Sequence, residues 1–99
     1  MKMLKEGHKY ELDAFEGTNP QIVQFIQKTE KDGELITEVD GTTNEEVIKM
    51  LINRLHILNG WVYDSYNSEA LIHLQNALNC MHARTAERKA RGVEGTPKI

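Results

Sequence analysis

The sequence predicts an α+β protein, with a β-rich N-terminal part packed on a C-terminal antiparallel pair of helices. Two observations carry this prediction. Runs of β-favouring residues flank the Asp-Gly dipeptide at positions 32 and 33, and apolar residues recur every three or four positions through the second half. We expect one domain, with a β-rich part at residues 1–41, a helical hairpin at 42–92 and a tail at 93–99.

Two strands are predicted around the Asp32-Gly33 dipeptide, which suits a two-residue hairpin turn. The first covers Ile22 to Lys28 and the second covers Glu34 to Val39. Further upstream, the segment "YELDAF" can alternate between two faces of a strand. Together these segments predict a small antiparallel sheet.

The first helix is predicted to run from Asn44 to Asn59. Its start is indicated by "TNEE", in which the Thr43 hydroxyl and the Glu46 carboxylate can form a capping box. After this start, apolar residues recur with a spacing of three or four, typical of one buried helix face: Ile48, Leu51, Leu55, Leu58 and Val62. Gly60 is predicted to end the helix.

The second helix is predicted to begin at a cap on Asn67 or Ser68 and to end near Arg91, with Gly92 as its C-cap. Its apolar positions repeat the same spacing: Leu71, Leu74, Leu78 and Met81. Two such helices with a short connector form an antiparallel hairpin whose leucine seams face each other. The connector also carries aromatic residues, which either cap this core, as we expect, or stack on a nucleobase: Trp61, Tyr63 and Tyr66.

Size and charge narrow the possible partners. A chain of 99 residues is short enough that a single core gives little stability, so we expect a homo-oligomer. The net charge is -3, yet residues 82–99 carry five basic and two acidic side chains. A small basic end on an acidic protein suits a small anion better than duplex nucleic acid, which favours a protein that is basic overall.

Catalysis is disfavoured by the motifs. The sequence lacks H-E-x-x-H, G-x-S-x-G and a phosphate-binding G-x-x-x-x-G-K, and its four histidines are scattered. We therefore expect no catalytic residues, no metal and no cofactor.

No apolar run is long enough for a membrane span, residues 1–10 lack the apolar middle of a signal peptide, and Cys80 is a single cysteine. These features predict a protein of the cytoplasm with no membrane partner.

Three arginines stand out in "RTAERKARGVEGT". Arg84, Arg88 and Arg91 share a face of the second helix, and guanidinium groups bind phosphates through a planar fork. The alternative is a solvated helix end, where the dipole favours positive charge. The following "GVEG" predicts a tail that packs back over the arginines, and we expect Arg91 to hold it through Glu94.

The segments "DGTTNEEVIKMLINRL" and "ARTAERKARGVEGT", with "QFIQK" before them, resemble a phage anti-defence hairpin family of cyclic nucleotide sponges. That family includes Thoeris anti-defence and anti-CBASS proteins, and the resemblance covers roughly residues 23 to 96. It implies a homo-oligomer, often a hexamer, in the cytoplasm of an infected bacterium. It also implies that cyclic ADP-ribose isomers, or cyclic di- and trinucleotides such as cGAMP, are held at subunit interfaces without being cleaved.

The resemblance also implies ligand-binding residues. Arg84 and Arg88 match the family's paired helix arginines that meet phosphates, with Arg91 beside them, and Asn67 matches a polar ligand contact at the start of the last helix. Tyr10 and Lys28 resemble an aromatic and lysine pair that binds cyclic dinucleotides. The connector "NGWVYDSYNSE" departs from the proline- and cysteine-containing connector of many relatives, which leaves ligand preference at that end open.

Two other functions remain as alternatives. The same arginines could bind phosphate backbones in a small phage DNA-binding or transcription-modulating protein. An enzyme that degrades the signal ranks third, because the chain offers no recognisable set of reactive groups.

Overall fold

The computed structural model describes residues 1–99 and confirms the α+β class. Its contacts divide the chain into two compact units. The first, here the sheet unit, comprises Met1–Thr43 with Gly95–Lys98, and the second, here the helical unit, comprises Asn44–Glu94 with Ile99. Each unit is described by itself.

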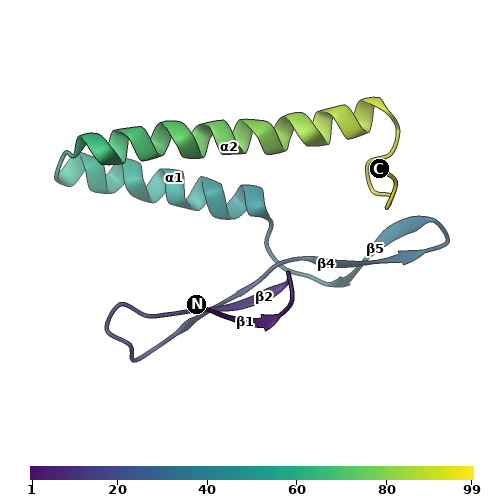
Figure 1. Ribbon diagram of the computed structural model, residues 1–99, viewed down its shortest axis with the longest axis horizontal. Helices are drawn as coiled ribbons and strands as arrows, with labels where there is room; N and C mark the ends of the chain where they lie inside the picture. The colour runs from purple at the N-terminus through teal and green to yellow at the C-terminus, as the bar shows by residue number, and fades with distance from the viewer. The chain divides into compact units, whose positions relative to one another are not determined.

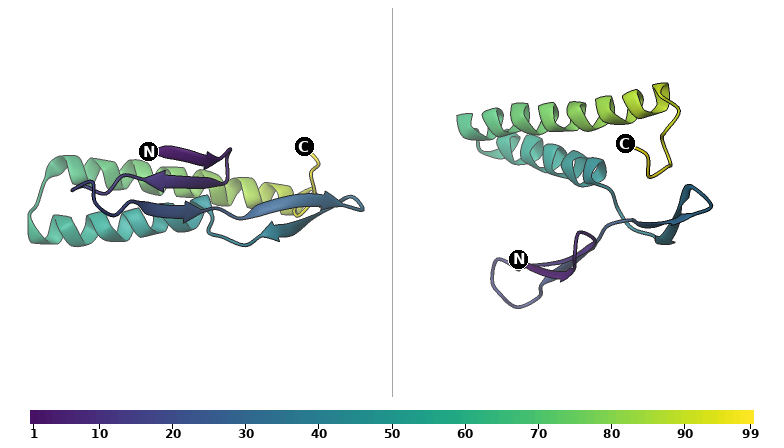
Figure 2. Two further views of the ribbon diagram at one scale, coloured as in Figure 1. Left: turned by 90° about the horizontal axis from the view of Figure 1, so that it is seen from below. Right: turned by 45° about the vertical axis from the view of Figure 1, so that its right-hand side comes forward.

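The sheet unit contains two small antiparallel sheets. Strands β1 (Lys2–Lys5), β2 (Lys9–Leu12) and β3 (Gln21–Gln24) form one sheet in the order β1-β2-β3. Strands β4 (Gln27–Lys31) and β5 (Glu34–Val39) form the other, a two-stranded ribbon (Figures 1 and 2). The bounds predicted for the strand after the turn are confirmed, whereas β1 was not predicted.

The β4–β5 turn has the geometry that the Asp-Gly dipeptide predicts. Asp32 and Gly33 both have positive φ, at 55° and 79°, and Lys31 pairs with Glu34 across the turn. Positive φ at both central residues is the type I′ pattern, whose twist matches that of the two strands. The turn therefore fixes the register of the ribbon.

The single strand predicted from Ile22 to Lys28 is wrong, because the structure divides it between β3 and β4. At the break, Phe25 donates to the carbonyl of His8 at 2.7 Å and forms a parallel bridge with Thr42. Thr42 exchanges two backbone hydrogen bonds there, with the Gln24 carbonyl and the Ile26 amide, each at 2.9 Å. These backbone contacts redirect the chain between the two sheets.

Gly41 makes this junction possible. A Cβ placed on it would lie 2.7 Å from the carbonyl carbon of Phe25 and 2.9 Å from the amide nitrogen of Ile26. Both are backbone atoms, which cannot move aside as the end of a flexible side chain can. The close approach of the two backbone segments therefore requires glycine.

The helical unit is an antiparallel hairpin of α1 (Asn44–Trp61) and α2 (Ser65–Ala90) (Figures 1 and 2). The leucine seam of α2 is confirmed, since Leu78 is buried and Leu71, Leu74 and Met81 are half-buried. On α1, Leu55 and Leu58 are half-buried. With 26 residues against 18, α2 is about 12 Å longer than α1 and extends beyond it at its C-terminal end (Figure 2).

The structure corrects the predicted helices at three positions: the end of α1, the last residue of its apolar seam and the N-cap of α2. Gly60 does not stop α1, because the helix continues to Trp61 and Val62 still donates to the Leu58 carbonyl at 3.0 Å. Val62 is 76% exposed and so is not part of the seam. The N-cap of α2 is Asp64, whose carboxylate accepts from the Tyr66 amide at 2.7 Å.

Asn59 explains why the cap lies before Asn67 and Ser68. Its side-chain oxygen accepts from the Asp64 amide at 2.8 Å, and its side-chain nitrogen donates to the Ser68 hydroxyl at 3.1 Å. The side-chain amide of Asn59 in α1 thereby binds both the connector and the first turn of α2. These contacts fix the Asp64 backbone at the point where the helix begins.

The connector aromatics do not cap the core of the hairpin, contrary to expectation. Trp61, Tyr63 and Tyr66 are 75%, 72% and 80% exposed.

Leu78 is the one buried hydrophobic residue of the whole chain. A single chain thus buries much less apolar surface than a domain of this length ordinarily does.

Candidate functional site

The basic end of α2 is built on a C-terminal cap that glycine completes. Gly92 has a φ of +73°, and its amide donates to the Lys89 carbonyl at 3.0 Å. The amide of Val93 donates to the Arg88 carbonyl, also at 3.0 Å. This pair of bonds is a Schellman motif, which confirms the predicted role of Gly92 at the end of the helix and turns the chain back over the last turn.

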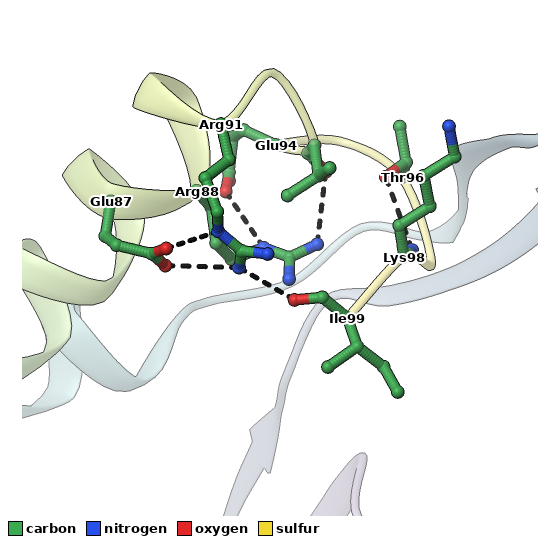
Figure 3. Close-up of polar contacts among 8 residues, drawn as sticks. Glu87, Arg88, Arg91, Glu94, Thr96, Lys98 and Ile99 are labelled. Carbon is green, nitrogen blue, oxygen red and sulfur yellow. Dashed lines mark hydrogen bonds and ion pairs between the residues drawn. The ribbon is translucent and has the colours of Figure 1, made fainter.

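Arg88 is the arginine that this returning segment covers. Its side chain is 11% exposed, its Nη2 donates to the Val93 carbonyl at 3.1 Å, and its Nε lies 3.4 Å from the Glu94 carboxylate (Figure 3). Arg88 therefore contacts Val93 through both its backbone and its side chain. The tail packs back over Arg88 and contacts Arg91 but leaves Arg84 exposed, and Glu94 is held by Arg88 and not by Arg91.

Arg91 is paired on the outer side of the same turn. Its guanidinium contacts the Glu87 carboxylate, with Nη2 3.2 Å from Oε2, and the same nitrogen donates to the backbone carbonyl of Ile99 at 2.7 Å (Figure 3). Both side chains of the Arg91–Glu87 pair are about half exposed. An i, i+4 pair in such a position contributes little to stability.

Arg84 differs from both. It lies one turn before Arg88 on α2, in the part of the helix that extends beyond α1, and its side chain is exposed. It makes no hydrogen bond or ion pair within the chain. Of the three arginines, Arg84 alone presents a guanidinium with no acceptor from its own chain.

Asn67 lies at the other end of the helical unit, half-buried in the first turn of α2. It precedes Arg84 by seventeen residues, which corresponds to about 26 Å along a helix. Within one chain, the structure therefore does not bring Asn67 and the arginines into one pocket.

Tyr10 and Lys28 belong to the sheet unit. Tyr10 lies on β2 opposite Val23, half-buried, and its ring meets that of Phe25 edge to face with centroids 5.9 Å apart. Lys28 lies on β4 opposite Thr37 and is exposed. The Tyr10 ring is thus already in an aromatic pair with Phe25, a contact that the sequence pattern did not reveal.

A groove of about 610 Å³ lies between the two helices, and its lining includes none of the ligand residues predicted for this unit, which are Asn67, Arg84, Arg88 and Arg91. Both apolar side chains and polar ones, among them amides, a hydroxyl and a histidine, line it. Its lining residues are Ile52, His56, Asn59, Ser68, Leu71, Ile72, Gln75 and Asn76.

No group of three or more His, Cys, Asp or Glu side chains is placed to hold a metal ion. None of the helices has the length and apolar content that crossing a membrane requires.

The comparisons with known proteins agree with the resemblance seen in the motifs. No protein-family model matches the chain. The chain is 41% identical over 58 residues to "Thoeris anti-defense 1" of Bacillus phage SBSphiJ7. The matched segment covers 58% of this chain and 41% of that relative, so the match spans less than half of the relative's length. The resemblance to a phage Thoeris anti-defence protein is thereby confirmed.

Proposed function

We propose that this chain, a relative of a phage Thoeris anti-defence protein, binds cyclic nucleotide immune signals and holds them unaltered in the cytoplasm of an infected bacterium. Its ligands in this proposal are cyclic ADP-ribose isomers, cyclic dinucleotides such as cGAMP, or cyclic trinucleotides of the related CBASS defence. The 41% identity over 58 residues supports the anti-defence role. Sequestration lowers the free signal below the concentration that the host effector needs.

The exposed guanidinium of Arg84, one helical turn from Arg88, is the observation that carries the binding proposal. Both belong to the local basic end of a protein whose net charge is -3. Two guanidinium groups can hold the two or three phosphates of a small cyclic signal through charge-assisted hydrogen bonds. An overall acidic chain repels a long polyanion, so the basic end favours a small ligand over a duplex.

The distance between Asn67 and Arg84 along α2 supports an oligomer. Asn67 and Arg84 are about 26 Å apart along the helix, so a signal that contacts both takes them from two different copies of the chain. The small number of buried apolar residues also supports an oligomer, because Leu78 is the one buried hydrophobic residue in a single chain. We propose a homo-oligomer, a hexamer in the family's usual form, with the ligand at an interface between subunits.

Tyr10 and Lys28 complete the proposal from the sheet unit. In this proposal the half-buried Tyr10 ring, which stands at 84° to the Phe25 ring, stacks on a base of the ligand. The exposed ammonium of Lys28 can meet a phosphate. Both residues are proposed as contacts for cyclic dinucleotides.

Calorimetry against a panel of cyclic dinucleotides, cyclic trinucleotides and cyclic ADP-ribose isomers tests binding. The bound sample is then heated to denature the protein, and the released ligand is identified by mass spectrometry. Recovery of intact signal supports sequestration. A chemically changed product would replace this proposal with an enzyme, and tight binding of duplex DNA with none of the panel would replace it with a DNA-binding protein.

A further inference from the structure

Two of the three arginines at the end of α2 already have an anionic partner within the chain. Arg91 is paired with Glu87 on the outer side, where both side chains are about half exposed. Arg88 is paired with Glu94 beneath the returning tail, where its own side chain is only 11% exposed (Figure 3). The two pairs have the same chemistry but differ in how far the guanidinium is removed from water.

The burial of Arg88 explains why a carboxylate accompanies it. A guanidinium withdrawn from water and left unpaired would lose solvation without compensation. Glu94 provides a negative charge at 3.4 Å, and the Val93 carbonyl provides a second acceptor at 3.1 Å. The cationic side chain is therefore held in one orientation before any ligand arrives.

The same contacts conflict with direct phosphate binding. Carboxylates and phosphates both use the planar fork of a guanidinium, so they compete for the same N–H groups. A phosphate can approach Arg88 through Nε only after the Glu94 carboxylate has left. The Glu94 carboxylate, whose side chain is 39% exposed, returns to water when it leaves, and the incoming phosphate replaces it as the counter-charge of Arg88.

The backbone around Glu94 allows this exchange. Val93 and Glu94 lie between Gly92 and Gly95, whose φ values are +73° and +80°. Glycine crosses between the left-handed and right-handed regions more readily than other residues. The Schellman bonds depend on the positive φ of Gly92, so Gly92 keeps its conformation, and the Glu94 side chain turns away through its own torsions and the backbone at Gly95.

We propose that Glu94 occupies the anion position on Arg88 in the free protein, and that a ligand phosphate takes the place of its carboxylate. This inference rests on the proposed binding of phosphate-bearing signals. Glu94 acts as a specificity-determining residue, because an incoming anion must compete with a carboxylate fixed a few ångströms away. A weak monoanion fails in that competition, whereas a ligand that also engages Arg84 succeeds.

The test compares Glu94→Gln with Glu87→Gln in the full chain. Each change removes one negative charge from the same end of α2, but only the first weakens the pair at Arg88. The probe is inorganic pyrophosphate, measured by calorimetry, and NMR follows the Nε–H resonance of Arg88. We expect Glu94→Gln to bind pyrophosphate about three- to tenfold more tightly than the parent, and Glu87→Gln to change by less than about twofold.

The NMR measurement separates exchange at Arg88 from a general charge effect. In the parent, pyrophosphate should shift the Arg88 Nε–H resonance, and in Glu94→Gln that resonance should already differ without ligand. Equal gains in the two variants would reduce the effect to net charge and overturn the proposal. Weaker binding by Glu94→Gln, or an Nε–H resonance that pyrophosphate does not move, would also overturn it.

The cyclic signals form a separate arm of the experiment. If no cyclic signal binds any variant while the pyrophosphate results hold, the proposed function fails and the exchange at Arg88 stands. In another outcome, the parent and Glu94→Gln bind the cyclic signals with equal affinity and also bind pyrophosphate with equal affinity. The proposed function then stands and the role of Glu94 fails.

Discussion

The carboxylate of Glu94 lies 3.4 Å from Nε of Arg88, six residues earlier in the chain, and joins the cap of α2 to the residue that the cap covers. Arg88 thus has a structural role whether or not it binds a ligand. Arg84, one turn away and exposed, has no such role. The two arginines should therefore respond differently to the same substitution.

Replacing Arg84 with alanine should weaken signal binding by about 1.5–3 kcal/mol, the range for hydrogen bonds to charged groups. The free energy of unfolding should barely change, because the side chain is exposed and has no partner within the chain. Lysine should restore binding only in part, since it keeps the charge but lacks the planar fork. Calorimetry and thermal unfolding measure the two effects, with Arg54→Ala on α1 as the matched control for loss of an exposed arginine. Unchanged binding of every panel ligand by a folded Arg84→Ala protein would return Arg84 to the role of a solvated charge.

Replacing Arg88 with alanine should weaken binding and also destabilise the fold by about 1–2 kcal/mol, because the Val93 and Glu94 contacts are both lost. Hydrogen exchange should show faster exchange of the Val93 amide, which donates to the Arg88 carbonyl in the parent. Chemical denaturation gives the change in stability. A variant as stable as the parent, with a protected Val93 amide, would contradict the structural role.

Alanine at Gly41 should destabilise the sheet unit by about 1–3 kcal/mol, because its Cβ would collide with the backbone of Phe25 and Ile26. Gly60→Ala is the matched control. A Cβ on Gly60 meets nothing within 4 Å, and the residue lies inside α1, so alanine there should stabilise by about 0.5–1 kcal/mol. Thermal unfolding of both variants tests the pair, and equal effects of the two changes would contradict the close approach at Gly41.

The proposed homo-oligomer should give, in light scattering, a mass of at least twice that of the 11.3 kDa chain. A fold that depends on association should also show a melting temperature that rises with protein concentration. A monomer with and without ligand, melting at one temperature over a hundredfold range of concentration, would remove the oligomer from the proposal.

Signal binding should weaken only gently as salt rises, because a ligand with two or three phosphates engages a handful of cationic groups. Affinity measured by calorimetry between low and moderate salt tests this expectation. Duplex DNA is the comparison ligand, and steep salt dependence together with comparable DNA binding would favour a nucleic-acid-binding protein.

Local sequence preferences predicted the elements that depend on local chemistry. The Asp32-Gly33 turn and strand β5 follow from residues that favour positive φ between two β-favouring runs. The start of α1 at Asn44 and the glycine at the end of α2 follow from capping patterns. In each case the determining residues lie within a few positions of the feature.

The features that were missed depend on residues distant in sequence. The break between β3 and β4 is imposed by the segment around Gly41 and Thr42, so the continuous β-favouring run from Ile22 gave no indication of it. The N-cap at Asp64 depends on the side chain of Asn59 in the preceding helix. The pairing of Glu94 with Arg88 depends on the direction in which the Schellman motif turns the chain, which the spacing of charges does not specify.

The exposure of so many apolar residues has a consequence for mutational tolerance. In a monomeric domain, a scan of substitutions separates an intolerant interior from a permissive surface. Here Leu78 is the one buried hydrophobic residue, while large side chains such as Trp61, Tyr66 and Ile72 are 75%, 80% and 61% exposed. If copies of the chain cover these residues, polar replacements at such outward positions should be selected against as strongly as replacements of Leu78. The pattern of tolerated changes would then follow the assembled particle and not the surface of the single chain.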